Sequence, residues 1–229
     1  MRPADLDFFS DGAALRSAVL SDAEVTGLLN RLGDDLEGRP GRRLLLDEQT
    51  RGLMTANGKV GAVAAAILGQ NVQPVRAVLF DKTRVANWIV AWHQDRTIAV
   101  RERHSTPGFG PWSVKDGIVH VAPPIEVLNR MVTLRVHLDA CTDDNAPLIV
   151  ALGSHRLGRV PADEVEAEAM RHPRFTCHAA AGDVWTYSTP ILHTSGRSVS
   201  DGRRRVLQLD YAADALPGGL EWMGVTRQR

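Results

Sequence analysis

The sequence predicts a mainly β protein, an antiparallel β-sandwich or barrel with flanking helices. Two observations support this fold class. The first seventy residues have helical patterns, and after Pro74 the chain changes to many short apolar or alternating runs bounded by turn residues. Helices followed by a series of short strands are typical of β-sheets that helices cover from outside. We expect one domain over residues 1–229, with a helical buttress at 1–72 and a β core at 73–213.

The helices are expected in three places. Ser21 is followed three residues later by Glu24, which is the pattern of a capping box ahead of an apolar run. A second helical stretch, rich in Ala, Leu and Val, covers residues 47–68. A third is acidic and Ala-rich, covers residues 162–170 and interrupts the strands.

The strands are predicted from short runs of apolar, β-branched and aromatic residues. These runs cover residues 75–80, 88–92, 131–138, 148–152, 184–187 and 206–211. Between them, the segment 96–124 is rich in Pro and Gly and fits no regular element well. A connection of that length in a compact domain is usually a functional loop or disordered. Because it directly follows a candidate metal motif, we expect it to form a lid.

Composition excludes several classes of partner. The chain has 229 residues, with 27 basic and 27 acidic side chains. A net charge of zero argues against nucleic acid or an anionic membrane as the main partner, because both require a basic surface. The N-terminus has no apolar signal segment, and the most apolar run, 60–68, is far shorter than the ~20 residues of a membrane helix. A cytoplasmic protein that acts on a small molecule is therefore expected.

The strongest chemical motif is His93-Gln94-Asp95 at the end of a predicted strand. Side chains at i and i+2 of a strand share a face, so His93 and Asp95 can both be directed toward the same metal site. With His193 they would form a two-His-one-carboxylate set, which leaves coordination positions open and suits a non-haem Fe(II) oxygenase.

A rival motif, His137-Leu138-Asp139, also ends a predicted strand. It runs into the turn-like residues 142–145, where Asp139 is better explained as a group that caps or turns the backbone. His93 instead opens onto the long segment 96–124, where a catalytic mouth is expected. The first motif is therefore favoured.

Arg204 is a candidate for binding a second ligand. If 188–211 contains a hairpin, His193 and Arg204 lie near each other on adjacent strands. A guanidinium beside the iron can pair bidentately with the distal carboxylate of 2-oxoglutarate. Ser195 shares the face of His193 and can add a hydrogen bond. The simpler alternatives are a partly buried histidine and a solvated basic cluster at residues 203–205.

In this combination the sequence resembles the phytanoyl-CoA dioxygenase family, which includes the ectoine hydroxylases. The residues that carry the resemblance are 92–95, 144–155, and 193–196 followed by Arg204, within a match from about residue 75 to 211. The resemblance implies a double-stranded β-helix (jelly-roll, cupin-like) core. It also implies Fe(II) as cofactor, with 2-oxoglutarate and O₂ as co-substrates. The expected reaction is hydroxylation of a small organic molecule, with decarboxylation of 2-oxoglutarate to succinate.

The resemblance also implies roles for individual residues. They are iron ligands at His93, Asp95 and His193, and 2-oxoglutarate contacts at Arg204, Ser195 and Arg135. Related halogenases carry Gly or Ala in place of Asp95. The intact carboxylate therefore favours hydroxylation, or a desaturating or ring-forming variant, over halogenation.

Substrate contacts are expected mainly from the predicted lid. The candidates are Trp92, Arg101, Arg103, His104 and Trp112. Two arginines in this set indicate an anionic group on the substrate. Two other functions remain open: a metal-dependent, cupin-like isomerase or hydrolase that does not use 2-oxoglutarate, and a non-catalytic binding module on the same fold. The isomerase or hydrolase reading gives Arg204 no task.

Overall fold

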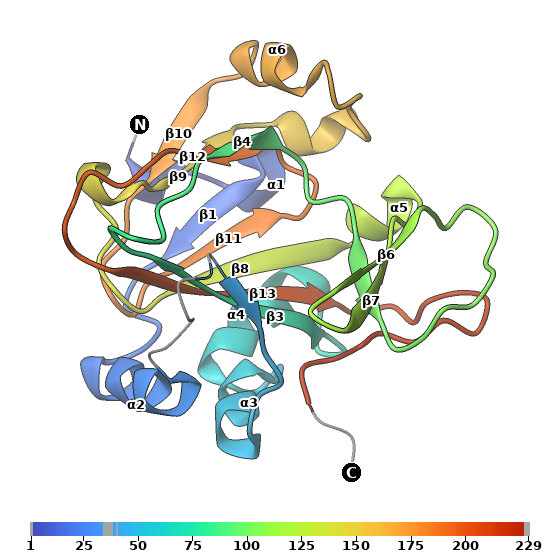
Figure 1. The fold of residues 1–229 in the computed structure, drawn as a ribbon, viewed down its shortest axis with the longest axis horizontal. Coiled ribbons are helices and arrows are strands. Elements are labelled where there is room, and N and C mark those ends of the chain that lie inside the picture. The colour runs from blue at the N-terminus through green and yellow to red at the C-terminus, as the bar shows by residue number, and fades with distance from the viewer. Residues whose placement is uncertain (1, 34–38, 40, 227–229) are drawn as a thin grey trace.

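The computed structural model describes residues 2–33, 39 and 41–226, and its main feature is a pair of facing β-sheets (Figure 1). The strands are β1 (Ala13–Arg16), β2 (Gly41–Arg43), β3 (Gln73–Lys82), β4 (Val90–His93), β5 (Ile98–Val100), β6 (Trp112–Lys115), β7 (Ile118–Val121), β8 (Met131–His137), β9 (Leu148–Ala151), β10 (Arg174–Cys177), β11 (Val184–Ser188), β12 (His193–Ser195) and β13 (Arg204–Ala212). The helices are α1 (Phe8–Asp11), α2 (Asp22–Leu32), α3 (Glu48–Met54), α4 (Lys59–Leu68), α5 (Ile125–Leu128) and α6 (Val165–Met170), with short 3₁₀ turns at Pro3–Asp5, Asp143–Asn145 and Ser154–Leu157.

The two main sheets form a double-stranded β-helix, which confirms the expected fold class. The larger sheet has six strands in the order β1-β11-β8-β13-β3-β2, and the smaller has four in the order β10-β9-β12-β4. A third sheet, β5-β7-β6, lies to one side in Figure 1. Neighbouring strands in all three sheets are antiparallel.

The alternation of side chains along the large sheet separates the core from the site. On β8, Leu134 and Val136 belong to the apolar core shared with α2, α3 and α4. Arg135, between them in sequence, lines the cavity between the two main sheets. The same parity holds on β13, where Leu207 and Leu209 face the helices and Gln208 faces the cavity. The helices therefore cover one face of the large sheet and leave the other available for polar side chains.

The N-terminal helices follow the sequence prediction with one difference. The capping box of α2 is present, since Ser21 accepts from the backbone of Glu24 and the Glu24 side chain accepts from that of Ser21. The expected single helix over 47–68 is two helices, α3 and α4. They meet so closely that a Cβ on Gly61 would lie 1.9 Å from the carbonyl oxygen of Thr55. Only glycine allows this contact.

Two expectations about secondary structure were wrong. The first seventy residues are not only helical, because β1 and β2 supply the two edges of the large sheet. The segment 96–124 is not irregular, because it contains β5, β6 and β7. Short strands of this kind are stabilised by pairing with distant residues rather than by local propensity, so the sequence pattern does not show them.

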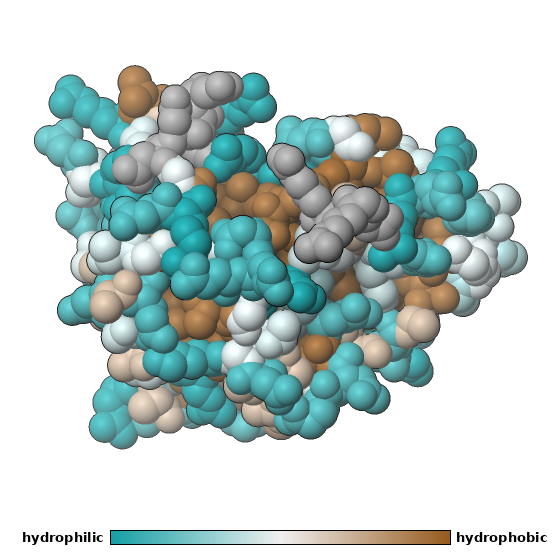
Figure 2. All heavy atoms as spheres, turned by 90° about the horizontal axis from the view of Figure 1, so that it is seen from below, coloured by the Kyte–Doolittle hydropathy of each residue, from teal (hydrophilic) through white to brown (hydrophobic). Residues whose placement is uncertain are grey.

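The outer surface mixes apolar and polar side chains. On the face that carries α2 and α3, hydrophobic patches are divided by hydrophilic side chains (Figure 2). Within the described part of the chain, none of the helices combines the length and apolar character needed to cross a bilayer.

Candidate metal and 2-oxoglutarate site

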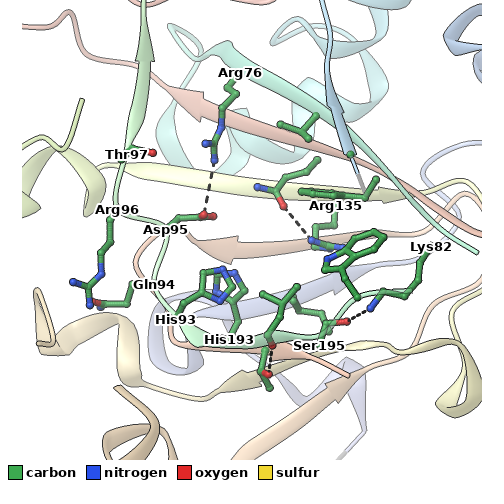
Figure 3. A pocket seen from close by; sticks show the side chains of 18 of the residues that line it. Arg76, Lys82, His93, Gln94, Asp95, Arg96, Thr97, Arg135, His193 and Ser195 are labelled. Carbon is green, nitrogen blue, oxygen red and sulfur yellow. Dashed lines mark hydrogen bonds and ion pairs between the residues drawn. The ribbon is translucent and has the colours of Figure 1, made fainter. Parts of the chain in front are cut away.

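Three side chains from two adjacent strands converge on one point. His93 is the last residue of β4, and His193, the first of β12, stands opposite it in the antiparallel register. Their ring centroids are 4.1 Å apart. Asp95 follows two residues after His93, and the candidate ligand atoms of all three residues lie within 4.8 Å of one another. Figure 3 shows the three side chains pointing into the same cavity.

The hydrogen bonds of the two imidazoles prepare this group for a metal ion. Nδ1 of His93 lies 2.9 Å from the carbonyl oxygen of Ala91, and Nδ1 of His193 lies 2.9 Å from that of Ile191. Because a carbonyl only accepts, each Nδ1 must carry the proton, which leaves each Nε2 with a free lone pair. Oδ2 of Asp95 is buried and has no hydrogen-bond partner. Two imidazole nitrogens and one carboxylate oxygen are therefore free to bind a cation.

Asp95 is held among positive groups. Nη2 of Arg76 lies 4.0 Å from Asp95 Oδ1, and Nε of Arg76 lies 2.5 Å from Asp210 Oδ2. Burial alone would raise the pKa of Asp95, but its charged neighbours, of which Arg76 is the strongest, outweigh burial, and the pKa is lowered. Burial, and then the neighbouring His93, lowers the pKa of His193 to about 4. At neutral pH the carboxylate is ionised and His193 is neutral, which are the states that metal ligands need.

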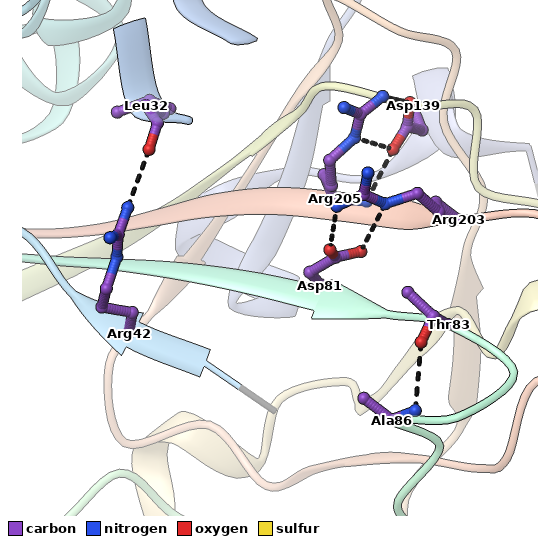
Figure 4. Close-up of polar contacts among 8 residues, drawn as sticks. All are labelled: Leu32, Arg42, Asp81, Thr83, Ala86, Asp139, Arg203 and Arg205. Carbon is purple, nitrogen blue, oxygen red and sulfur yellow. Dashed lines mark hydrogen bonds and ion pairs between the residues drawn. The ribbon is translucent and has the colours of Figure 1, made fainter. Parts of the chain in front are cut away.

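The rival motif is used differently. Arg205 donates to both carboxylate oxygens of Asp139, from Nη2 to Oδ1 and from Nε to Oδ2, each at 2.8 Å (Figure 4). The backbone N–H of Arg205 also donates to Asp139 at 2.8 Å. His137 is buried, and burial keeps its pKa well below the ordinary value. Among the described residues, only His93, Asp95 and His193 form a group that could hold a metal ion.

The same cavity continues from the triad to a second set of cations. Its volume is about 430 Å³, and Arg204, Arg135 and Lys82 line it. Arg204 is 2% exposed, and its Nε and Nη1 have no hydrogen-bond partner. Arg135 donates from Nη1 to Gln208 Oε1 at 3.0 Å, while its Nε has no partner. These unpartnered N–H groups form a site for an acceptor, because burying them without one is costly.

Lys82 joins this set from β3, where it stands opposite Arg204. Its Nζ donates to Ser195 Oγ at 3.3 Å (Figure 3). It also donates to the Gly196 carbonyl at 2.6 Å. Ser195 uses its own proton to donate to the carbonyl of Ala146 at 2.9 Å. Ser195 therefore positions Lys82, and its hydroxyl proton is already engaged.

Burial, followed by mutual repulsion, lowers the pKa values of this set. Burial, and then Arg204 and Arg135, lower the pKa of Lys82 to about 8. Burial, and then Arg135, lower the pKa of Arg204 to about 10. Three cations that share one buried pocket form a strong site for an anion, because their charges reinforce one another in a low dielectric.

The five proposed substrate residues do not line this cavity. Trp92 packs on the apolar cluster around α6, and Arg101 pairs with Glu221 at 2.5 Å. The guanidinium of Arg103 lies 5.3 Å from the ring centroid of Trp112, which packs beside β5 and β7. His104 is 3.1 Å from Glu102. After Asp95 the chain turns into the third sheet, which places Arg101, Arg103, His104 and Trp112 away from the triad, whereas Trp92 lies on β4 beside His93 and packs toward α6.

Other residues of the cavity were not anticipated from the sequence. Arg76 and Lys82 occupy positions of β3 that alternate with core residues, and Val78 and Phe80 lie between them on the same face. A signal was present, because Arg76 is a charged residue within an otherwise apolar part of the strand. Gln208 carries the same signal on β13.

Comparisons with known proteins agree with this arrangement. The family model described as phytanoyl-CoA dioxygenase (PhyH) matches residues 8–206 of the chain. No curated protein sequence matches it.

Several solved structures are similar in fold. The epimerase SnoN, in complex with Fe³⁺, alpha ketoglutarate and nogalamycin RO, is 19% identical with a TM-score of 0.66 and coverage of 97% of this chain and 94% of that one. EctD from S. alaskensis, in its apoform, is 20% identical, with a TM-score of 0.65 and coverage of 96% and 79%. HygX from Streptomyces hygroscopicus, with nickel and 2-oxoglutarate bound, is 16% identical, with a TM-score of 0.59 and coverage of 90% and 84%. At these identities the likeness shows the shared fold.

Proposed function

This chain belongs to the phytanoyl-CoA dioxygenase family, and on that premise we propose that it is an Fe(II)- and 2-oxoglutarate-dependent oxygenase that hydroxylates a small organic molecule. The observation that carries the proposal is the pairing of two sites in one cavity. A triad with three free donor atoms lies beside a buried cationic pocket whose N–H groups have no partner.

His93, Asp95 and His193 are the proposed iron ligands. Their mixed nitrogen and oxygen donors on one face suit non-haem Fe(II) and leave the opposite positions available. When bound, the iron and 2-oxoglutarate together activate O₂, with 2-oxoglutarate converted to succinate and CO₂. Arg76 keeps Asp95 ionised and oriented, while the two carbonyl contacts hold each imidazole in the ligating tautomer.

Arg204, Lys82 and Arg135 are the proposed 2-oxoglutarate contacts. The unpartnered Nε and Nη1 of Arg204 are donors available to the oxygens of a distal carboxylate. Lys82 supplies a second charge, and Ser195 and Gly196 hold its ammonium in place. HygX and SnoN support this proposal, because their structures contain 2-oxoglutarate on the same fold.

The intact carboxylate favours hydroxylation, or a desaturating or ring-forming variant, over halogenation. Asp95 occupies the position at which related halogenases have a residue without a carboxylate, so no space for a halide is created. A cupin-like hydrolase or isomerase is less consistent with the cavity, because it would leave the cations around Arg204 without a ligand.

The test is an anaerobic titration of the Fe(II)-loaded protein with 2-oxoglutarate, followed by the weak visible charge-transfer band of the chelate. We expect a saturating band and, on admission of air, release of succinate. A protein that binds iron at full stoichiometry but forms no band would contradict the proposal. A band without succinate, in the presence of O₂ and candidate substrates, would indicate a binding module.

A further inference from the structure

A second group of cations lies on the wall of the cavity, away from Arg204. Arg43 on β2 stands opposite Val78, so that it shares the cavity-facing side of β3. Lys115, the last residue of β6, lines the same cavity. Val78 is four residues from Lys82 along β3, or about 13 Å. A five-carbon diacid held by Lys82 and Arg204, with its other end on the triad, does not fill this part of the cavity.

The hairpin formed by β6 and β7 places Lys115. Its turn is Asp116-Gly117, with φ of 51° and 75°. Asp116 Oδ2 lies 2.7 Å from Nη1 of Arg43, and Nε of Arg43 lies 3.4 Å from Nε2 of His120. The hairpin is therefore attached to β2, and Lys115, at its turn, lines the same cavity as Arg43.

Among the residues that the structure describes, the charges in this part of the cavity are not balanced. Arg76 has Asp210 and Asp95 as counter-ions, and Arg43 has Asp116. Within the described residues, Lys115 has no carboxylate at ion-pair distance. Burial, and then the charges of Arg43 and Arg76, lower the pKa of Lys115, while Asp95 acts in the opposite direction. Asp95 is the one carboxylate among the described residues that line the cavity, and a metal ion bound to it would make this part of the cavity more positive.

We propose that Lys115 and Arg43 bind an anionic group of the primary substrate, a carboxylate or a phosphate, and hold that substrate beside the triad. This inference rests on the proposed oxygenase function, because it assigns the remaining part of the same cavity. It also moves anion recognition from Arg101 and Arg103, which are engaged with Glu221 and Trp112, to a pair that lines the cavity. The substrate anion competes with Asp116 for Arg43.

The test is a titration of the anaerobic protein with Fe(II) and saturating 2-oxoglutarate, using methylphosphonate, propionate and neutral propionamide as probes. Binding is read from the shift of the charge-transfer band and by calorimetry. We expect saturable binding of at least one anion, no binding of propionamide, and a weaker affinity at high salt. The anion that binds more tightly distinguishes phosphate from carboxylate recognition.

Four variants make the test specific. Lys115→Gln should weaken anion binding about fivefold, which is the range for a partly solvated charge contact, whereas Lys115→Arg should retain it. Asp116→Asn should tighten binding, since it frees Arg43, and Asn tolerates the positive φ at this position. Arg101→Gln, in the same segment but outside the cavity, is the control and should change nothing. None of the four should alter the affinity for 2-oxoglutarate.

The outcomes separate this inference from the oxygenase proposal. If the band forms but no anion binds, or if Lys115→Gln binds anions as well as the parent does, the inference is overturned and the oxygenase proposal stands. If iron binds and no band forms, the oxygenase proposal fails. Calorimetry without 2-oxoglutarate then decides the inference: anion binding that depends on Lys115 supports it, and its absence overturns it.

Discussion

Replacing Arg204 by methionine should weaken 2-oxoglutarate binding and, at the same time, stabilise the unliganded protein. The side chain is 2% exposed, and two of its nitrogens have no partner. Losing a buried charge pair with a ligand carboxylate costs about 2–5 kcal/mol. That range corresponds to an increase in the dissociation constant of about 30- to 5000-fold.

The stability of the unliganded protein should change in the opposite direction. Burial, and then Arg135, lower the pKa of Arg204 from 12.5 to about 10, which corresponds to about 3 kcal/mol for keeping the charge in place. A methionine keeps an apolar stem of similar length and removes the charge. The free energy of unfolding at neutral pH should therefore rise, by on the order of 1–3 kcal/mol.

The assay combines anaerobic 2-oxoglutarate titration with chemical denaturation of the ligand-free protein. Arg205→Met is the matched control, because Arg205 is the next residue of β13, points to the other face and pairs with Asp139. It should lower stability and leave 2-oxoglutarate affinity unchanged. If Arg204→Met bound 2-oxoglutarate as tightly as the parent, or if it were less stable than Arg205→Met, the account of this pocket would be wrong.

Three further predictions follow from the same structure. His93→Ala should abolish stoichiometric iron binding, measured by metal analysis. His137→Ala should keep the iron and lose about 2–4 kcal/mol of stability, because it truncates a buried side chain. The reverse result would show that the iron ligand is His137 and not His93. The pKa of Lys82 is lowered to about 8 by burial and by Arg204 and Arg135, so its charge is present below that pH and lost above it. The dissociation constant of 2-oxoglutarate should be constant below about pH 7 and should rise above about pH 8 by at most about tenfold per pH unit. Lys82→Met should bind 2-oxoglutarate weakly and should not show this rise. An equal rise in both proteins would exclude Lys82 as the titrating group. Arg76→Leu should lower the free energy of unfolding by about 3–5 kcal/mol, because it leaves Asp210 buried without its counter-ion. The double variant Arg76→Leu with Asp210→Leu should recover most of that loss in denaturant titrations. If it recovered nothing, the broken ion pair would not be the cause of the lost stability.

The proximity of the triad could be predicted because it depends on two local facts. Strand alternation places His93 and Asp95 on one face, and a strand ending at a loop exposes them. Antiparallel pairing of β12 with β4 then brings His193 opposite His93. The cations on the cavity wall, Arg43 and Lys115, could not be predicted in the same way. Arg43 reaches the cavity through an edge strand of three residues, too short to have a pattern of its own.

The substrate-contacting residues were harder to predict than the residues of the cavity wall, because their placement depends on the direction in which the chain leaves the site. Arg101 follows β5, whose partner is β7, and the pairing of Ile98 with Val121 carries the chain away from the triad. The segment does carry the two arginines on which the prediction relied, but Arg101 pairs with Glu221 and Arg103 lies over the ring of Trp112. Sequence indicates which charges exist, and only the sheet pairing decides which of them meet in a cavity.

The pairing of β13 explains why Arg204 and not Arg205 faces the cavity. Near the start of the strand, Asp139 fixes the outward side chain of Arg205 by two side-chain hydrogen bonds. Near its end, Asp210 is inward and paired with Arg76, while Tyr211 is outward and donates to the carbonyl of Met54 at 3.0 Å. A slip of one residue would exchange the two faces and break all of these contacts together. The polar contacts on both faces of β13 therefore select the register in which a cation lies beside the metal triad.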